Sequence, residues 1–125
     1  MNQQKNAVSA YLAMAALGTV VQVAMVVAGH YNAFIRENVF AIGGMSISLV
    51  FGALWAAKAA RSKGGGFVGG AIVGGLCAFL GIALSVAMGD VPAGVLAFGT
   101  AGSAVAGGIG GVGLYALAGR KPAAA

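Results

Sequence analysis

Residues 66–88 read GFVGGAIVGGLCAFLGIALSVAM and contain no Asp, Glu, Lys or Arg. An α-helix rises 1.5 Å per residue, so a run of this length can cross a bilayer core of about 30 Å. Gly66, Gly70 and Gly74 recur four residues apart, which places them on one helix face, and Ala78 continues the row. The run therefore predicts a transmembrane helix with one smooth side.

Three further runs without charged residues surround this one, giving four expected spans at 7–29, 39–57, 66–88 and 93–118. The linkers between them are short: His30–Asn38, Lys58–Gly65 and Gly89–Pro92. Short linkers join antiparallel neighbours, and each run is about twice as long as a membrane-spanning strand. We expect an all-α polytopic membrane protein, with four transmembrane helices as two antiparallel hairpins in one bundle. A single domain over 1–125 and no soluble domain follow from this.

The composition excludes the other classes of protein. Of the 125 residues, 60% are hydrophobic and only 7% are charged, whereas a soluble domain carries about 25% charged residues. The net charge of +5 lies in small clusters at the ends of the spans, so contact with anionic lipid headgroups explains it. We expect the lipid bilayer, and no nucleic acid, as the partner of these charges.

The basic residues predict the orientation. Six of the seven flank one side of the predicted bundle: Lys5, Lys58, Arg61, Lys63, Arg120 and Lys121. Basic residues in short loops stay cytoplasmic, so we expect both termini inside, in the inner (cell) membrane of a bacterium. Tyr11, Trp55 and Tyr115 fall near the same side, where aromatic rings suit the membrane interface. Cleavage of the first span as a signal peptide is an alternative, although its apolar core is longer than usual.

Glycine is concentrated in the second half of the chain, in rows at helical spacing. The predicted helix-packing positions are Gly66, Gly70, Gly74, Gly99, Ser103, Gly107, Gly111, Gly44, Ser48 and Gly52. Rows of small residues let helix backbones approach closely, which drives helix association in lipid. The rows pack within one chain or against a second copy or another membrane subunit, and the sequence leaves both interpretations open. Gly102, Ala106 and Gly110 form a second smooth face on the last span.

Two glycine motifs are misleading. Residues 108–113, GIGGVG, match a dinucleotide-binding fingerprint, but no strand precedes them and no acidic residue follows. Gly64, Gly65 and Gly66 lack the ending of a phosphate-binding loop and are interpreted as a flexible turn into the third span. We expect no cofactor.

Few side chains inside the spans are polar. Gln22 lies in the middle of the first span, and its amide is expected to face the bundle interior. An interhelical hydrogen bond and a pore contact are both consistent with this position. The linker His30–Asn38 holds further polar candidates, His30, Arg36 and Glu37. They could gate access, but we favour a structural linker in which Arg36 and Glu37 reach headgroups and Asn38 caps the second span.

The polar residues restrict the function. One histidine and two distant acids provide neither a nucleophile–base pair nor metal ligands, so no enzyme is expected. The spans lack the carboxylate on which proton-coupled transporters depend. We expect a protein that acts through glycine-row helix association, as a homo-oligomer or an accessory subunit. The alternative is an uncoupled channel or permeation unit lined by Gln22, Thr19, Ser46, Ser48, Thr100 and Ser103. A membrane-lesion protein of the holin type is a third possibility.

Overall fold

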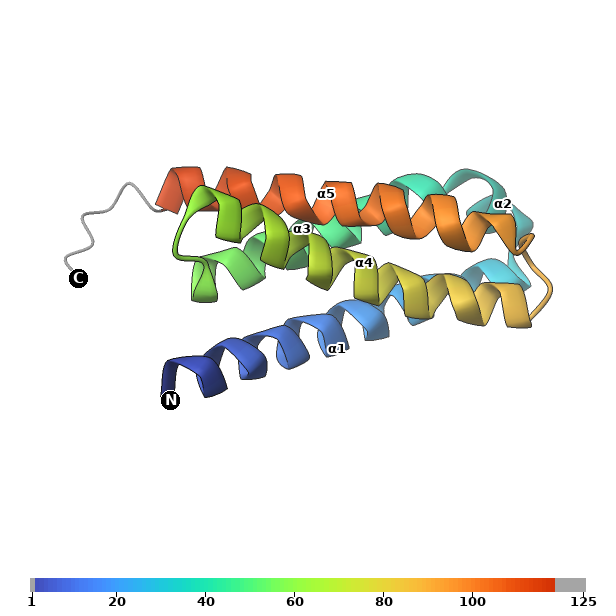
Figure 1. Cartoon of the computed structure of the whole chain (residues 1–125). Coiled ribbons are helices and arrows are strands. Elements are labelled where there is room, and N and C mark those ends of the chain that lie inside the picture. The colour runs from blue at the N-terminus through green and yellow to red at the C-terminus, as the bar shows by residue number, and fades with distance from the viewer. Residues whose placement is uncertain (1, 119–125) are drawn as a thin grey trace.

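The computed structural model describes residues 2–118, and these residues form five helices (Figure 1). The helices are α1 (Asn2–Tyr31), α2 (Ala33–Asn38), α3 (Phe40–Ala59), α4 (Lys63–Ala87) and α5 (Gly94–Ala118). Four of them, all except α2, are long and apolar enough to cross a membrane. They match the four predicted spans, with bounds that differ by a few residues.

The linker after α1 is itself helical, which the sequence did not predict. Asn32 is the N-cap of α2, and its Oδ1 accepts hydrogen bonds from the backbone N–H groups of Phe34 and Ile35. The prediction that Asn38 caps the second span is wrong, because its Nδ2 donates to Phe34 O within α2. Val39 precedes α3 and makes no side-chain cap. The backbone of Asn32 is extended, so its side chain reaches the free amides in the first turn of α2.

The three consecutive glycines are also helical. Ser62 is the N-cap of α4, and its Oγ accepts from Gly65 N at 2.9 Å. Gly64, Gly65 and Gly66 therefore form the first turn of α4, and their interpretation as a flexible turn is wrong. The serine satisfies an amide that would otherwise have no partner at the helix start.

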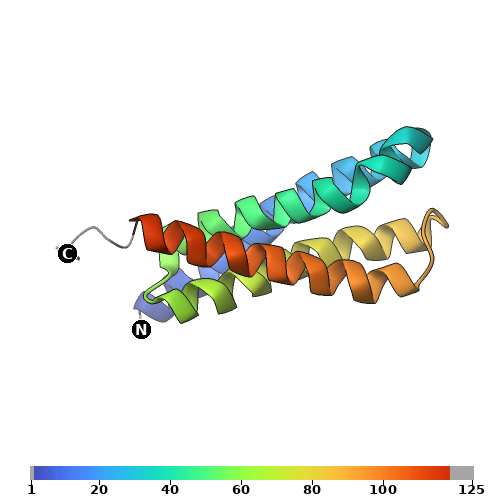
Figure 2. The same cartoon turned by 90° about the horizontal axis from the view of Figure 1, so that it is seen from above.

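The two central helices are α3 and α4. Both contact α1 on one side and α5 on the other, and in the described residues α1 and α5 have no backbone contact. The start of α1 and the end of α5 lie at the end of the molecule where α3 connects to α4, and α2 lies at the opposite end (Figures 1 and 2). We call these the α3–α4 end and the α2 end.

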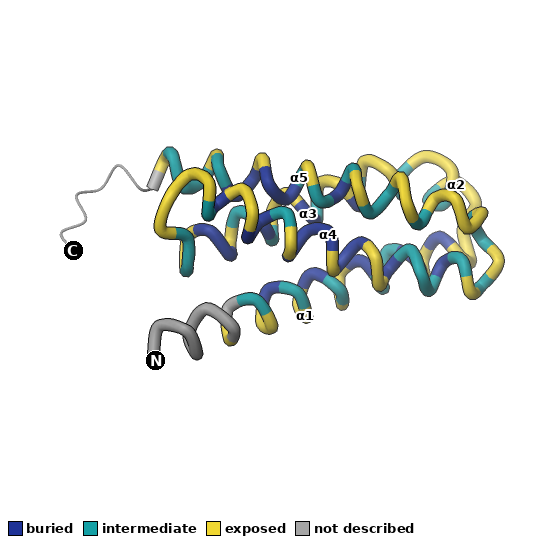
Figure 3. The backbone as a smooth tube through the Cα atoms, in the orientation of Figure 1, coloured by how far each residue is buried: buried dark blue, intermediate teal, exposed yellow. Residues whose placement is uncertain are grey.

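The glycine rows pack against one another inside the chain. A Cβ atom on Gly66 would lie 2.9 Å from Gly111 O, and one on Gly74 would lie 2.7 Å from Ser103 O. A Cβ on Gly70 would collide with Gly107 O. These positions bring the backbones of α4 and α5 into direct contact, and buried residues follow the facing sides of the helices (Figure 3). The bundle is thus tightest where side chains are absent.

An apolar cluster fills the α3–α4 end. Met14, Trp55, Ala56 and Val73 are buried together, and Tyr11 stacks on Trp55 with ring centroids 4.8 Å apart. Trp55 is only 4% exposed, so its ring packs inside the bundle at this end. Gly69 of α4 has no side chain to compete for the space, and the indole ring lies against it.

Candidate functional site

A cavity of about 410 Å³ lies between the helices in the half of the molecule nearer α2. All four long helices and α2 line it, and most of the lining is apolar. The lining residues are Gln22, Met25, Val26, Arg36, Glu37, Phe40, Ala41, Gly44, Met45, Ala78, Ile82, Ser85, Val91, Val95, Phe98, Gly99 and Ser103. Its size falls in the range of small-molecule sites, which are mostly apolar with a few placed polar groups.

The cavity forms because α3 and α5 separate toward the α2 end (Figure 2). Lower in the bundle, a Cβ on Gly52 would lie 2.8 Å from Gly107 Cα, and one on Gly110 would lie 3.0 Å from the Leu49 carbonyl carbon. Nearer the α2 end, the facing positions carry Phe40, Met45 and Phe98, whose bulk keeps the two backbones apart. Small residues therefore bring α3 and α5 into contact along one half of the line where the two helices meet (the α3–α5 seam). Large residues keep them apart along the half nearer α2.

A polar cluster lies at the deep end of the cavity, where α1, α3 and α4 meet. Gln22 is 2% exposed, and its Nε2 donates to Gly44 O at 3.1 Å and to Ser48 Oγ at 3.3 Å. Ser48 Oγ donates in turn to Gly74 O at 3.1 Å. Cys77 Sγ lies 3.8 Å from Gln22 Nε2 and 3.4 Å from Gly74 O. We call Gln22, Gly44, Ser48, Gly74 and Cys77 the Gln22 cluster.

These hydrogen bonds define which side of the Gln22 amide remains free. Both named bonds use Nε2, and in the described residues no donor is bonded to Oε1. Gln22 also lines the cavity. An amide oxygen is a hydrogen-bond acceptor with two lone pairs. The Gln22 cluster thus offers an acceptor to a molecule in the cavity.

Ser85 belongs to the lining residues, but its hydroxyl is buried behind the cavity wall. The residue is 1% exposed, and its Oγ has no hydrogen-bond partner in the described part of the chain. It lies one turn beyond Gly81, which packs against the Cβ of Gln22. A buried polar group without a partner costs about 1–3 kcal/mol, so Ser85 lowers the local stability, and the acceptor that the cavity offers is Gln22 Oε1.

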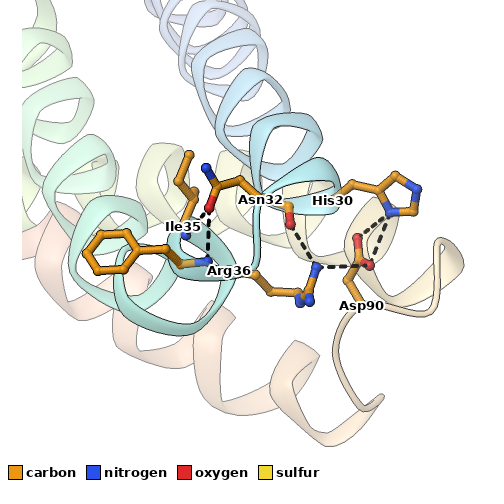
Figure 4. A network of polar contacts seen from close by, with 7 residues as sticks. His30, Asn32, Ile35, Arg36 and Asp90 are labelled. Atoms are coloured by element: carbon orange, nitrogen blue, oxygen red, sulfur yellow. Dashed lines mark hydrogen bonds and ion pairs between the residues drawn. The ribbon is translucent and has the colours of Figure 1, made fainter.

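Charged residues lie at the rim. Arg36 Nη1 donates to Gly29 O at 2.9 Å and lies 3.9 Å from Asp90 Oδ1, so the guanidinium is held by contacts within the protein (Figure 4). His30 Nδ1 lies 2.9 Å from Asp90 Oδ2. The contact joins the end of α1 to the turn between α4 and α5, across 60 residues of sequence. Glu37 is exposed beside Arg36.

Asp90 is the member of this rim that the sequence analysis missed. The sequence predicted that both acids are distant from His30, whereas the structure places Asp90 in direct contact with it. One signal could have found the pair. The linkers His30–Asn38 and Gly89–Pro92 were both assigned to one side of the bundle, so opposite charges in them were free to meet.

The arrangement suits the binding of an uncharged molecule. Arg36 and Glu37 are the charged side chains in the lining, and both belong to α2 at the rim. Deeper in the cavity the polar groups are an amide and hydroxyls, which cannot compensate a buried charge. The chain matches no protein-family model, no curated protein and no solved structure. The chemistry of the cavity is therefore the basis for a functional proposal.

The structure separates the predicted site residues into three groups. Gln22, Arg36, Glu37, Gly44, Gly99 and Ser103 line the cavity. Five glycines pack α4 against α5: Gly66, Gly70, Gly74, Gly107 and Gly111. Gly52 packs α3 against Gly107. Ser48 lies in the Gln22 cluster, and His30 in the rim contact with Asp90. Of the other proposed pore residues, Ser46 is exposed, whereas Thr19 and Thr100 have buried hydroxyls outside the cavity lining.

Proposed function

We propose that the four long helices cross the cell membrane of a bacterium as two antiparallel hairpins of one bundle, with both ends of the chain in the cytoplasm. Lys58, Arg61 and Lys63 lie at the α3–α4 end, and basic residues of short loops remain cytoplasmic. At the α2 end Arg36 is next to Asp90. Large apolar side chains exposed along the helices, such as Leu12, Ile42 and Phe98, suit contact with lipid.

In this orientation the cavity opens to the outside, and we propose that the protein is an uncoupled permeation unit for small uncharged solutes. The observation that carries the proposal is the cavity itself, which reaches from Arg36 and Glu37 at the rim to Gln22 in the middle of α1. The polar groups at its deep end are uncharged, which suits a solute that carries no charge.

The α3–α4 end is closed by packed side chains, so the proposed pathway is gated. Trp55, Tyr11 and Met14 fill the bundle below the Gln22 cluster. A solute that enters from the outside would stop at the Gln22 cluster until this apolar cluster rearranges. Ions are expected to be excluded, because the apolar cluster of Trp55, Tyr11 and Met14 offers no partner for a charge.

Association with a second copy or another membrane subunit stays a prediction. The glycine rows that motivated it have partners within one chain: Gly66, Gly70 and Gly74 on α4 face Ser103, Gly107 and Gly111 on α5. The second smooth face of α5 is also used, since Gly110 lies against Leu49 of α3 and Gly102 against Met45. Any further association would use the outer faces of the helices.

Flux through liposomes tests the permeation proposal. Vesicles that contain the purified full-length chain should equilibrate at least one of the uncharged solutes glycerol, urea and hexanediol faster than protein-free vesicles, and should retain K⁺. Gln22→Leu removes the polar group at the deep end and should lower the flux severalfold. Val21→Leu, on the exposed side of the same helix, is the matched control. Vesicles as tight to all three solutes as protein-free ones would contradict the proposal.

A further inference from the structure

We infer that the cavity selects neutral amphipathic molecules, each with an apolar body and one hydrogen-bond donor at its leading end. The inference rests on the proposed function, because it names the class of solute for the same cavity. It depends on three observations: the apolar walls, the position of the unpaired acceptor, and the side on which the cavity opens.

The walls favour an apolar body. Thioether, branched and aromatic side chains line the cavity: Met25, Val26, Phe40, Met45, Ile82 and Phe98. Methionine side chains adapt to irregular shapes, and aromatic rings give large contact areas. A sugar or another solute with many hydroxyls would leave most of them without partners against these walls.

The deep end favours a donor. Gln22 Oε1 is free of donors among the described residues because the amide directs its Nε2 to Gly44 O and Ser48 Oγ. The Gln22 amide is held in this orientation by bonds to both partners, so an entering molecule meets the oxygen. The Ser85 hydroxyl is buried behind the wall and takes no part in this recognition. A hydroxyl, amide N–H or similar donor on the ligand satisfies the Gln22 oxygen.

The opening faces the side of the bundle as well as its end. The cavity lies in the part of the α3–α5 seam where the two helices separate, between Ala41 and Met45 on α3 and Val95 and Phe98 on α5. Phe98 is 83% exposed and Ala41 is exposed. With the helices in a membrane, this gap faces the lipid of the outer leaflet, where amphipathic molecules concentrate.

Protection of an engineered cysteine tests the inference. Val95→Cys places a thiol in the cavity wall, and Ala93→Cys places one at an exposed position in the turn before the same helix, outside the lining. Both are made in the native chain, because Cys77, its one cysteine, is 0% exposed and out of reach of the reagent. The rate of modification by a small water-soluble methanethiosulfonate is measured in nanodiscs. The ligands are para-propylphenol, its methyl ether para-propylanisole, and glycerol.

The expected result is specific to the donor and to the cavity. The phenol should slow modification at position 95 at concentrations about five- to tenfold lower than the ether, as the loss of one net hydrogen bond predicts. It should leave position 93 unaffected, and glycerol should protect neither. Gln22→Leu should remove the difference between phenol and ether while keeping protection by both.

Three outcomes would overturn the inference. Equal protection by phenol and ether in the protein that retains Gln22 would show that the cavity recognises no donor. Protection by glycerol alone would show that the cavity binds polar solutes. Flux of uncharged solutes through liposomes without any protection by the phenol would reject this solute class and leave the permeation proposal intact. Protection by the phenol without flux would reject permeation and leave the amphipathic binding site.

Discussion

Gly107 is the residue at which α3, α4 and α5 meet. A Cβ on Gly52 of α3 would lie 2.8 Å from Gly107 Cα, and a Cβ on Gly107 itself would lie 3.0 Å from Gly74 Cα and strike Gly70 O. Glycine in a helix interior costs about 1 kcal/mol relative to alanine in water. The close packing of three backbones compensates for it, and packing of this kind drives helix association where burial of apolar surface does not.

Gly107→Ala should therefore destabilise the bundle, with a free energy of unfolding lower by about 1–3 kcal/mol, as overpacking of a tight core predicts. Gly113→Ala is the matched control on α5, because a Cβ there would meet nothing within 4 Å. That control should be neutral or stabilising through helix propensity. Unfolding in mixed micelles, followed by circular dichroism, measures both. Similar destabilisation by the two changes would contradict the three-helix junction.

At the scale of elements, α4 depends on a single side chain at its start. Its first turn contains Gly64, Gly65 and Gly66, which have poor helix propensity, and Ser62 Oγ accepts from Gly65 N. Packing begins at Gly66, which contacts Gly111 of α5. The cap therefore stabilises the turn that lies before the first interhelical contact.

Ser62→Ala should unravel this turn, at a local cost of about 1 kcal/mol. Hydrogen exchange at the amides of residues 64–66 should become faster by about fivefold, while exchange in the middle of α4 stays the same. Ser62→Asp keeps a capping oxygen and should retain the slow exchange. Unchanged exchange in the alanine variant would show that the rest of the bundle holds the turn without the cap.

At the scale of the whole molecule, the two ends of the bundle differ. The α3–α4 end is filled by Trp55, Met14 and their neighbours, while the α2 end contains the cavity. The His30–Asp90 contact links α1 to the turn between α4 and α5 at the open end. The molecule is thus closed on one side of the Gln22 cluster and accessible on the other, the asymmetry that a gated pathway requires.

Trp55→Ala should weaken the closed end and increase the flux of uncharged solutes severalfold in the liposome assay. Leu54→Ala, at an exposed position next to it, is the control. Loss of a buried aromatic residue costs about 3–5 kcal/mol, so folded protein is confirmed first. Gly69→Ala, whose new Cβ would displace the Trp55 ring, provides a milder second variant. Flux that stays unchanged in both variants would contradict the proposed gate.

The sequence predicted the elements better than their ends and contacts. The charge-free runs located all four long helices, because a helix that avoids water must be apolar along its length. The capping of α2 by Asn32 was missed, because several residues of that linker can cap and backbone conformation chooses between them. Gln22 was recognised as a candidate because an amide in the middle of an apolar run requires partners. Those partners, Gly44 and Ser48, depend on how α1 packs against α3.

By itself the sequence determined the class of protein, the number of long helices and the smooth faces on them, since these depend on local composition and helical spacing. Only the tertiary structure decided which smooth faces meet. The row of Gly66, Gly70 and Gly74 could have faced another chain, and it faces α5. The cavity and the His30–Asp90 contact were decided at the same level. The physical reason is that small residues allow close approach without choosing a partner, whereas the partner depends on how all the helices fit together.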